Sequence, residues 1–568
     1  MATAPLLLLL VSLLIGGGPA NQSADDAVIG MAARDATHRA VLLGPYSRYG
    51  WHHPGPTYLY ILGVPTRLWG GSPTGTWIGA TTLAAVLAAA VVLALRRWGG
   101  SRAGWWGAVA VVLVVCGVGA GAWRDPWNPY GVVFPVLFTV VAAALAGSGA
   151  RGAFVWAGVA GSLAVQTHVS TLPIVVAALA LGAVGRLRHH SPIQGPAIPT
   201  GLPALGVGPR SARWWRQRPD LAVGGAILVF EWALPLWDEL FGTHNLSSLL
   251  SFFAARHPVH PLGASWRIAV SLIGVTLGQH HAAMRDGILD AHPLVTTFCY
   301  LGLAGCGIVA GIKGRRPLAV WLGAMSALAL LIAVWSISRV VGPPYKYLLV
   351  WITALPALPV AAAAIGISGV VTARIAPDRA LLPVPVTFTD RVMDWLARPG
   401  AVVTAIAVTV ASFVGLRAAL EATPAAALTD PDIARATRAV APVVALVHGP
   451  VRFVINDGER WPTAAGVGLQ LERAGHPMHA DEQWTFLFGG RRRATGREEA
   501  VIVIAGSDPA SWPLPSQATQ VGVAGRARVF VARQGPACWW GWVPFGGPAC
   551  PLPIAPRTAG PPPLLLAR

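Results

Sequence analysis

Charged residues are scarce in this chain, and lysine is almost absent. Only 12% of the 568 residues are Asp, Glu, Lys or Arg, and the two lysines are Lys313 and Lys346. Ordinary soluble domains carry about 25% charged residues, so the composition excludes that class. The net charge of +18 does not indicate nucleic-acid binding, because the arginines gather in short segments between apolar runs, where positive charge marks the cytoplasmic side of a membrane protein.

Cysteines and the familiar motifs of soluble enzymes are also few. Of five cysteines, Cys116, Cys299 and Cys306 lie in apolar segments, where cysteine acts as a small apolar residue. No CxxC, HExxH, nucleotide P-loop or GxSxG sequence occurs in a usable context, which leaves those chemistries without support. Cys538 and Cys550 lie near the end of the chain, where we expect a disulfide rather than free thiols.

Long hydrophobic runs dominate what is present. The chain is 54% hydrophobic, with a mean hydropathy of +0.56. Crossing about 30 Å of hydrocarbon takes roughly 20 apolar residues. The first window has the length of a signal peptide but lacks a basic start and a clear cleavage site, so we predict a helix. The sequence predicts a polytopic α-helical membrane protein with about 11 transmembrane helices, near residues 4–20, 76–95, 104–122, 131–147, 153–165, 169–184, 220–237, 293–312, 317–336, 346–367 and 399–417.

Positive charge between these windows predicts the topology. The arginine-rich connections alternate along the chain, which makes them cytoplasmic and puts the N-terminus in the cytoplasm. One of them, residues 186–218, has six arginines, no acid and a Pro/Gly-rich middle, as expected for a basic linker near anionic lipids. The loops at 21–75 and 238–292 then face outward. Within the second loop, residues 264–278 are expected to form an amphipathic helix in the outer interface.

The chain changes character after residue 417. Residues 418–568 lack long apolar spans and contain short strand-like runs at 451–455, 500–506 and 527–533, with a helical pattern at 462–474. This alternation predicts a small extracytoplasmic α/β domain. Residues 1–417 form the membrane domain.

Polar residues gather in the outward connections, although an apolar scaffold holds ionisable groups only at a cost. The most unusual stretch is GPYSRYGWHHPGP at residues 44–56. The polar and aromatic residues of these connections are candidates for a functional site, but each also has a simpler explanation. Asp25 and Asp26 could be helix caps and Asp125 a turn former. Arg339 and Lys346 could be snorkelling anchors, and the aromatic residues could form an interfacial belt. His168 has the alternative of a satisfied interfacial histidine.

Five segments in the same order carry a resemblance to a known family. They are the acidic pair Asp25-Asp26, GPYSRYGWHHPGP, DPWNP at 125–129, SLAVQTHVS at 162–170 and SRVVGPPYKY at 338–347. This arrangement resembles the GT-C superfamily of integral membrane glycosyltransferases, and most closely actinobacterial relatives of protein mannosyltransferases and aminoarabinose transferases. The resemblance implies inverting transfer of a hexosyl or pentosyl group from a polyprenyl-phosphate donor to a cell-envelope acceptor at the outer face of the cell membrane.

The resemblance also implies roles for individual residues. Asp26 matches the family's first-loop acid and is the predicted base, and Asp125 matches the second acid. Ile29, Gly30 and Met31 stand where members often carry a glutamate, which weakens the case for an acid pair or a metal site. No cofactor is certain, and a divalent metal (Mg or Mn) is a further expectation with no ligands assigned. The predicted substrate-binding residues are Arg48, His52, His53, Trp127, Gln166, His168, Arg339, Tyr345 and Lys346.

Two other functions fit a membrane protein with such loops. A transporter or flippase of lipid-linked sugars predicts inverted repeats and interrupted helices at the midplane, and the sequence shows neither. An inactive GT-C-like scaffold, whose external domain binds glycan, is the second alternative, because of the missing glutamate.

Overall fold

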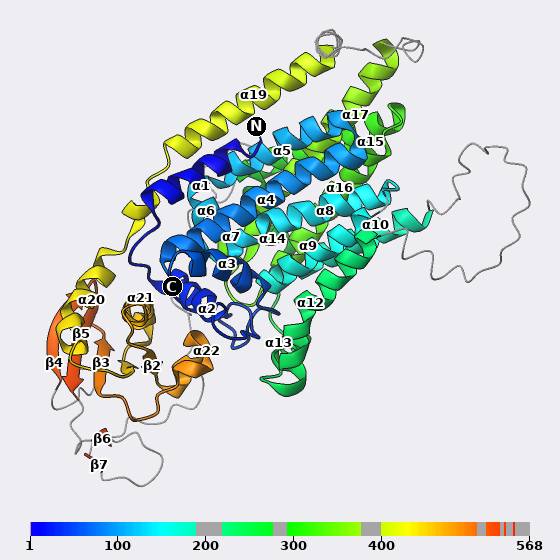
Figure 1. Cartoon of the computed structure of the whole chain (residues 1–568). Helices are drawn as coiled ribbons and strands as arrows, with labels where there is room; N and C mark the ends of the chain where they lie inside the picture. Colours follow the sequence, from blue (N-terminus) through cyan, green and yellow to red (C-terminus); the bar gives the residue numbers. More distant parts are fainter. Residues whose placement is uncertain are drawn as a thin grey trace, which may run out of the picture.

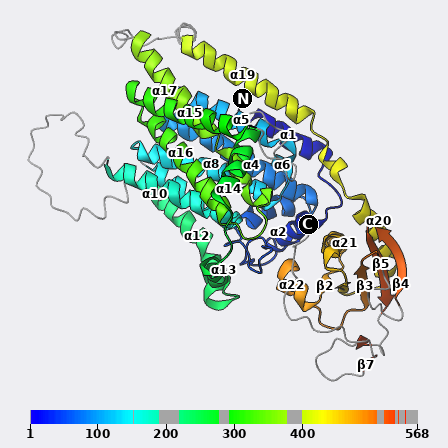
Figure 2. The same cartoon turned by 180° about the vertical axis from the view of Figure 1, so that it is seen from behind.

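A computed structural model describes residues 2–150, 152–188, 219–276, 292–375, 399–507, 518–533, 539–540 and 549–550. It consists of a bundle of long helices with a small α/β domain at one end (Figure 1 and Figure 2). Most of the predicted basic linker at 186–218 lies outside the described residues, as do Cys538 and the side chain of Cys550 in the predicted disulfide.

Every apolar window predicted from the sequence coincides with a helix. Seven described segments are long and apolar enough to cross a membrane: Pro73–Gly99, Ser101–Val118, Asn128–Gly147, Val169–Arg188, Pro293–Lys313, Pro317–Ser338 and Lys346–Arg374. The helices are α1 (Ala4–Gly16), α4 (Pro73–Gly99), α5 (Ser101–Val118), α8 (Val133–Gly147), α9 (Ala153–Thr167), α10 (Leu172–Arg188), α12 (Pro219–Phe241), α15 (Pro293–Lys313), α16 (Pro317–Ser338), α17 (Ala357–Ile375) and α19 (Pro399–Leu420).

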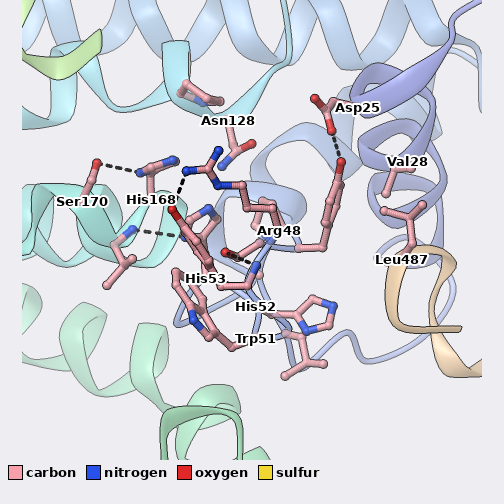
Figure 3. Close-up of a pocket in the computed structure, with 18 of the residues that line it drawn as sticks. Asp25, Val28, Arg48, Trp51, His52, His53, Asn128, His168, Ser170 and Leu487 are labelled. Carbon is pink, nitrogen blue, oxygen red and sulfur yellow. Dashed lines mark hydrogen bonds between the residues drawn. The ribbon is translucent and has the colours of Figure 1, made fainter. Parts of the chain in front are cut away.

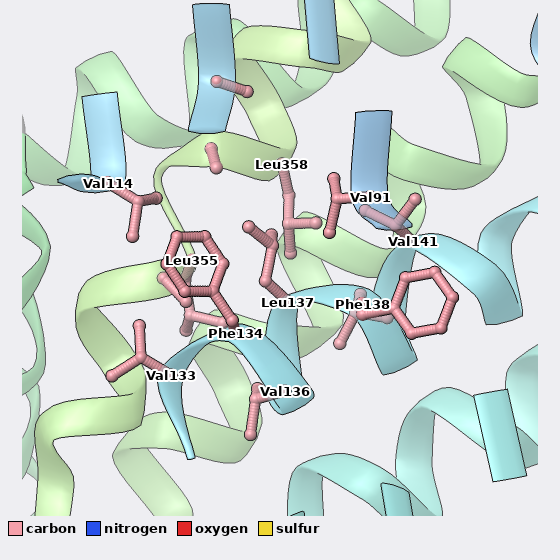
Figure 4. Packing of buried hydrophobic residues seen from close by; sticks show 14 of the residues in the cluster. Val91, Val114, Val133, Phe134, Val136, Leu137, Phe138, Val141, Leu355 and Leu358 are labelled. Atoms are coloured by element: carbon pink, nitrogen blue, oxygen red, sulfur yellow. The ribbon is translucent and has the colours of Figure 1, made fainter. Parts of the chain in front are cut away.

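Helix α8 forms the centre of the bundle. All its residues are buried, and Phe134 and Leu137 pack among side chains of α4, α5 and α17 (Figure 4). Small residues bring neighbouring helices close, as is usual in membranes. A Cβ added to Gly185 of α10 would lie 2.5 Å from the Trp321 ring of α16. The bundle is therefore held by shape and apolar contact.

One predicted element is placed differently from the expectation. Residues 264–278 were expected to lie on the surface of the outer interface, but α14 (Leu262–Thr276) is buried in the bundle over its second half. Val270 and Ile273 are fully buried, and the Thr276 hydroxyl donates to the Thr353 carbonyl at 2.7 Å. The helix has apolar residues on more than one side, so packing against α16 and α5 is more favourable than lying at an interface.

Shorter elements collect at the end of the bundle that faces the α/β domain. They include a hairpin loop at residues 44–53, which contains most of GPYSRYGWHHPGP. The helical elements there are α2 (Ala24–Asp35), α3 (Thr57–Leu68), α6 (Ala120–Arg124), α7 (Asn128–Gly131), α13 (Asn245–Ala254) and the 3-10 helices η1 (Val169–Thr171) and η2 (Lys346–Ala354).

The C-terminal domain, from α20 to β5, has a five-stranded sheet in the order β2-β1-β3-β5-β4. Strand β1 is parallel to β2 and β3, whereas β5 is antiparallel to β3 and β4. The three predicted strands and the predicted helix are all present. The elements are α20 (Pro431–Val444), β1 (Val451–Ile455), α21 (Trp461–Arg473), β2 (Met478–Ala480), α22 (Glu482–Phe488), the 3-10 helix η6 (Gly490–Arg492), β3 (Ala500–Ala505), β4 (Thr519–Ala524) and β5 (Ala527–Arg533).

Candidate active site

A cavity of about 920 Å³ lies between the end of the bundle and the C-terminal domain. Its wall combines the hairpin loop and α2 with the starts of α7 and α10, the end of α16, and the segment from α22 to η6 (Figure 3). Six of the predicted substrate-binding residues line it: Arg48, His52, His53, Trp127, His168 and Arg339.

The hairpin loop is built by backbone hydrogen bonds across the GPYSRYGWHH sequence. The Gly44 N–H donates to the His53 carbonyl at 3.2 Å, and the His53 N–H donates to the Pro45 carbonyl at 2.8 Å. Gly44 has no room for a side chain, because an added Cβ would lie 2.6 Å from the carbonyl oxygens of His53 and Gly55. The tight pairing presents Tyr46, Arg48 and the two histidines to the cavity.

His52 connects three parts of the molecule. Its backbone N–H donates to Asn245 Oδ1 at 2.8 Å, and its carbonyl accepts from Asn245 Nδ2 at 3.0 Å. Its ring Nε2 lies 3.1 Å from the Phe486 carbonyl of α22. Burial lowers the pKa of His52 to about 4, although the Phe486 carbonyl and the charge of Asp238 oppose the shift. A neutral ring that donates to Phe486 therefore fixes the loop against the C-terminal domain.

His53 and His168 form a buried pair with ring centroids 4.3 Å apart. His53 Nδ1 accepts the Val169 N–H at 3.2 Å, so its proton resides on Nε2. His168 Nδ1 lies 2.7 Å from Ser170 Oγ. Burial lowers the pKa of His53 well below its ordinary value, the neighbouring His168 lowers it further, and burial lowers that of His168 to about 3. Both rings are neutral hydrogen-bonding groups in the cavity wall.

Three carboxyl groups meet beside the cavity. Asp25 and Asp26 occupy the first turn of α2, and Asp125 precedes α7. Asp25 lines the cavity and accepts a hydrogen bond from the Tyr46 hydroxyl (Figure 3). Asp26 and Asp125 share a hydrogen bond and do not appear in the wall of this cavity. The Trp127 backbone N–H donates to Asp125 Oδ1 at 2.8 Å.

Burial has the largest influence on the pKa of each of these carboxyl groups. It raises the pKa of Asp26 well above its ordinary value, and the charges of Asp125 and Asp25 raise it further. Burial raises the pKa of Asp125 to about 6, against hydrogen bonds from Trp127 and Asp26 that lower it. Burial also raises the pKa of Asp25, while donors on Tyr46 and Trp127 lower it. Of the three, only Asp25 is presented to the cavity.

Arginines without acidic partners occupy another part of the wall. Arg48 donates to the Val341 carbonyl at 3.1 Å and to the Pro343 carbonyl at 3.3 Å, and it stacks over the Tyr345 ring at 4.8 Å. Over the part of the chain that the structure describes, Arg39 and Arg339 form no side-chain hydrogen bond or ion pair. Guanidinium groups so placed suit an anionic ligand.

Three of the predicted substrate-binding residues, Gln166, Tyr345 and Lys346, lie outside the wall of the cavity. Gln166 is fully buried, where it donates to the Glu231 carbonyl at 3.0 Å and accepts from the Thr57 hydroxyl at 2.8 Å. It therefore supports the base of the hairpin loop. The Tyr345 ring stacks against the Arg48 guanidinium, and Lys346 is the first residue of η2.

The structure gives Tyr46 of the hairpin loop a partner, and it adds cavity residues of the C-terminal domain that sequence reasoning missed. Tyr46 holds Asp25, and Trp461, Leu487, Arg491 and Arg492 bring the C-terminal domain into the wall. The run of three arginines at 491–493 was the available signal for the last two, but nothing in the sequence relates it to α2.

The carboxyl cluster is the part of the site whose residue types could suit a divalent metal. Within the described ranges, no group of three or more His, Cys, Asp or Glu side chains is arranged to hold a metal ion.

Comparison with known proteins identifies the fold. No protein-family model matches the sequence, and no curated protein matches it. Two crystal structures of ArnT from Cupriavidus metallidurans, one bound to undecaprenyl phosphate and one in the apo state, each align with a TM-score of 0.52 over 93% of this chain and 96% of that chain. The identities are 17% and 16%. The chain thus has the overall fold of the ArnT structures, which confirms the fold class that the sequence resemblance implied, a polytopic helical bundle with a small α/β domain.

Proposed function

We propose that this protein is a membrane glycosyltransferase that moves a hexosyl or pentosyl group from a polyprenyl-phosphate donor to an acceptor hydroxyl, with inversion at the anomeric carbon. One observation carries the proposal: a single cavity holds a carboxylate without a cationic partner and arginines without acidic partners. The likeness to ArnT bound to undecaprenyl phosphate supports a donor of this class.

Asp25 is the carboxylate best placed to act as the base. It takes the proton from the acceptor hydroxyl as the acceptor oxygen attacks the anomeric carbon, and the bond from that carbon to the phosphate oxygen breaks, leaving its electron pair on the lipid phosphate. A correctly placed base contributes about 10²–10⁴-fold to such a step. The sequence-based choice was the neighbouring Asp26, which stays a prediction. We favour Asp25 because it lines the cavity, whereas Asp26 does not.

The departing phosphate is the most negative group in the reaction. We assign it to Arg48 and Arg339, since preorganised cations stabilise charge that develops on a leaving group. The neutral ring of His53 would then donate from Nε2 to a sugar or phosphate oxygen, that of His52 would accept from a sugar hydroxyl at Nδ1, and Trp127 would cover the sugar face. This scheme needs no metal ion.

The orientation remains part of the proposal. With the N-terminus in the cytoplasm, the cavity and the C-terminal domain lie outside, where a cell-envelope acceptor is available. The arginine distribution supports that orientation.

The test uses the purified full chain with a panel of polyprenyl-phosphate sugars, including pentosyl and hexosyl donors, and follows release of the lipid phosphate. Release with at least one donor, lost in Asp25→Asn, supports the proposal. Absence of turnover with every donor and acceptor extract, or full activity in Asp25→Asn, Asp26→Asn and Asp125→Asn alike, overturns it.

A further inference from the structure

Helix α2 belongs to two hydrophobic cores at once. Ala27, Val28 and Met31 are part of the core of the C-terminal domain. Ile29 and Ala33 pack instead against residues of α3. The helix that carries Asp25 and Asp26 is therefore held between the bundle and a domain more than 400 residues later in the chain (Figure 1).

A third face of α2 points to the cavity. Asp25, Val28, Ala32 and Asp35 all line it, and their spacing of three or four residues follows one side of a helix. Each residue turns an α-helix by about 100°. A rotation of α2 by one residue would therefore carry Asp25 away from the cavity. The rotational position of α2 decides which carboxyl group meets a substrate.

Three charged side chains gather with Asp35, the last residue of this helix. Arg492 reaches Asp35 Oδ2 at 2.8 Å and Glu472 Oε1 at 2.7 Å, and it also donates to the Phe488 carbonyl at 2.6 Å. Arg491 reaches Asp35 Oδ1 at 2.6 Å and Glu472 Oε2 at 3.0 Å. We call Asp35, Glu472, Arg491 and Arg492 the clamp.

The clamp is buried and balanced in charge. The side chains of Arg492 and Glu472 are 1% and 5% exposed, and two carboxylates face two guanidiniums. Burial by itself raises the pKa of Glu472, but the hydrogen bonds and charge of Arg492 and the charge of Arg491 outweigh it, so that the pKa is lowered. Removing one partner from such a group leaves a buried charge uncompensated, which is strongly unfavourable.

We propose that the clamp makes the C-terminal domain a positioning element of the active site, fixing the rotation of α2 so that Asp25 faces the cavity. The clamp residues act through α2 and touch no reacting atom in this role. This inference rests on the proposed function for its effect on turnover, but the positioning of α2 is measurable without any substrate.

Glu472 provides the sharpest test, because it belongs to the clamp but does not line the cavity. Glu472→Gln keeps the shape of the side chain and removes its charge. The matched control is Glu498→Gln, which alters another buried glutamate of the same domain; its Oε1 lies 2.7 Å from His479 Nδ1, and neither residue contributes to the α2 core contacts.

The first measurement is hydrogen–deuterium exchange of α2 amides in the substrate-free full chain. Loss of a charge-assisted contact is expected to speed exchange across residues 24–35 about tenfold or more in Glu472→Gln, and to speed it more there than in β1 and β3. Glu498→Gln should leave α2 unchanged. Unchanged α2 exchange in Glu472→Gln, or an equal rise in both variants, overturns the proposal. If Glu472→Gln does not fold, Arg491→Gln, which removes the more exposed arm of the clamp, takes its place.

The second measurement separates positioning from substrate binding. With a donor that the wild type uses, Glu472→Gln is expected to lower kcat about tenfold with little change in KM for the donor, as for a displaced catalytic group. An unchanged kcat, or a change confined to KM, counts against positioning. If the wild type transfers no sugar at all, the proposed function fails while the exchange experiment still decides the clamp.

Discussion

Charged side chains border the cavity in two contrasting arrangements. In the clamp, two carboxylates and two arginines contact each other within 3.0 Å. Elsewhere in the wall, Asp25 is held by hydroxyl and indole donors, and Arg48 by carbonyl oxygens. The protein therefore pairs opposite charges where it needs rigidity and keeps them apart where we place the reaction.

Keeping charges apart in a largely apolar cavity is costly, because burial disfavours the ionised form of each group. The raised pKa of Asp25 reflects this cost. A donor with a phosphate and a sugar would relieve it by bringing an anion to the arginines and a hydroxyl to the carboxylate. The clamp bears no such relation to a ligand, since its charges already satisfy each other. Variants in the two groups should therefore fail in different ways.

The largest effect is expected from Asp25→Asn. An amide cannot accept the acceptor proton, so kcat should fall about 10²–10⁴-fold, while the thermal unfolding temperature stays close to that of the wild type. Asp26→Asn is the matched control, because Asp26 is the neighbouring acid and lies outside the wall of the cavity; a loss below about tenfold is expected. If Asp26→Asn is the inactive variant and Asp25→Asn retains turnover, the base is Asp26, as the sequence predicted.

Breaking the clamp should instead reduce stability. Arg492→Met leaves Asp35 and Glu472 buried without their main cation, and we expect a loss of about 3–5 kcal/mol in the free energy of opening of the C-terminal domain. Hydrogen exchange of the β1 and β3 amides measures it. The control is Arg435→Met, which breaks an exposed pair with Asp432 and should cost less than about 1 kcal/mol. Equal losses of stability in Arg492→Met and Arg435→Met would show that the clamp stabilises the domain no more than a surface ion pair does.

Much of the bundle could be predicted from the sequence, because a run of apolar residues is a local property. The helix windows and the strands at β1, β3 and β5 were recognised for that reason. Helix α14 was placed wrongly, since its burial depends on α16 and α5 rather than on its own pattern. We also expected Asp26, Asp125, His53, His168 and Arg339 to line one cavity; the last three do, whereas Asp26 and Asp125 lie outside its wall.

Other parts of the site depend on contacts that no local pattern reveals. Adjacent residues on a helix differ by about 100° in direction, so the sequence could not decide whether Asp25 or Asp26 faces the cavity. Helix α2 packs on α21 of the C-terminal domain, a contact between segments far apart in the sequence. Gln166 was taken for a substrate contact because it lies with His168 between two short apolar windows, where it could complete the site from the opposite wall. Its partners, Thr57 and the Glu231 carbonyl, are instead parts of the fold.

The arginines of the cavity wall that have no acidic partner are expected to contribute to donor binding. Arg339→Gln removes an unpaired guanidinium from the wall, and we expect KM for the polyprenyl-phosphate donor to rise about 10–100-fold, the value of a charge-assisted hydrogen bond. Arg256→Gln removes a nearby exposed charge that does not line the cavity and serves as the control. A similar rise in both variants would mean that only the overall positive potential matters.

The smallest and most specific effect is expected from Tyr46→Phe. The Tyr46 hydroxyl donates to Asp25 and lowers its pKa, so removing it should raise that pKa. A base works when ionised, and activity falls as the pH drops through its pKa; the acidic limb of the kcat/KM profile should therefore move to higher pH, by about one unit for one hydrogen bond. Tyr49→Phe, whose hydroxyl donates to the Val341 carbonyl, should leave the limb in place. A limb that does not move in Tyr46→Phe would assign it to another group and remove the reason for preferring Asp25 over Asp26.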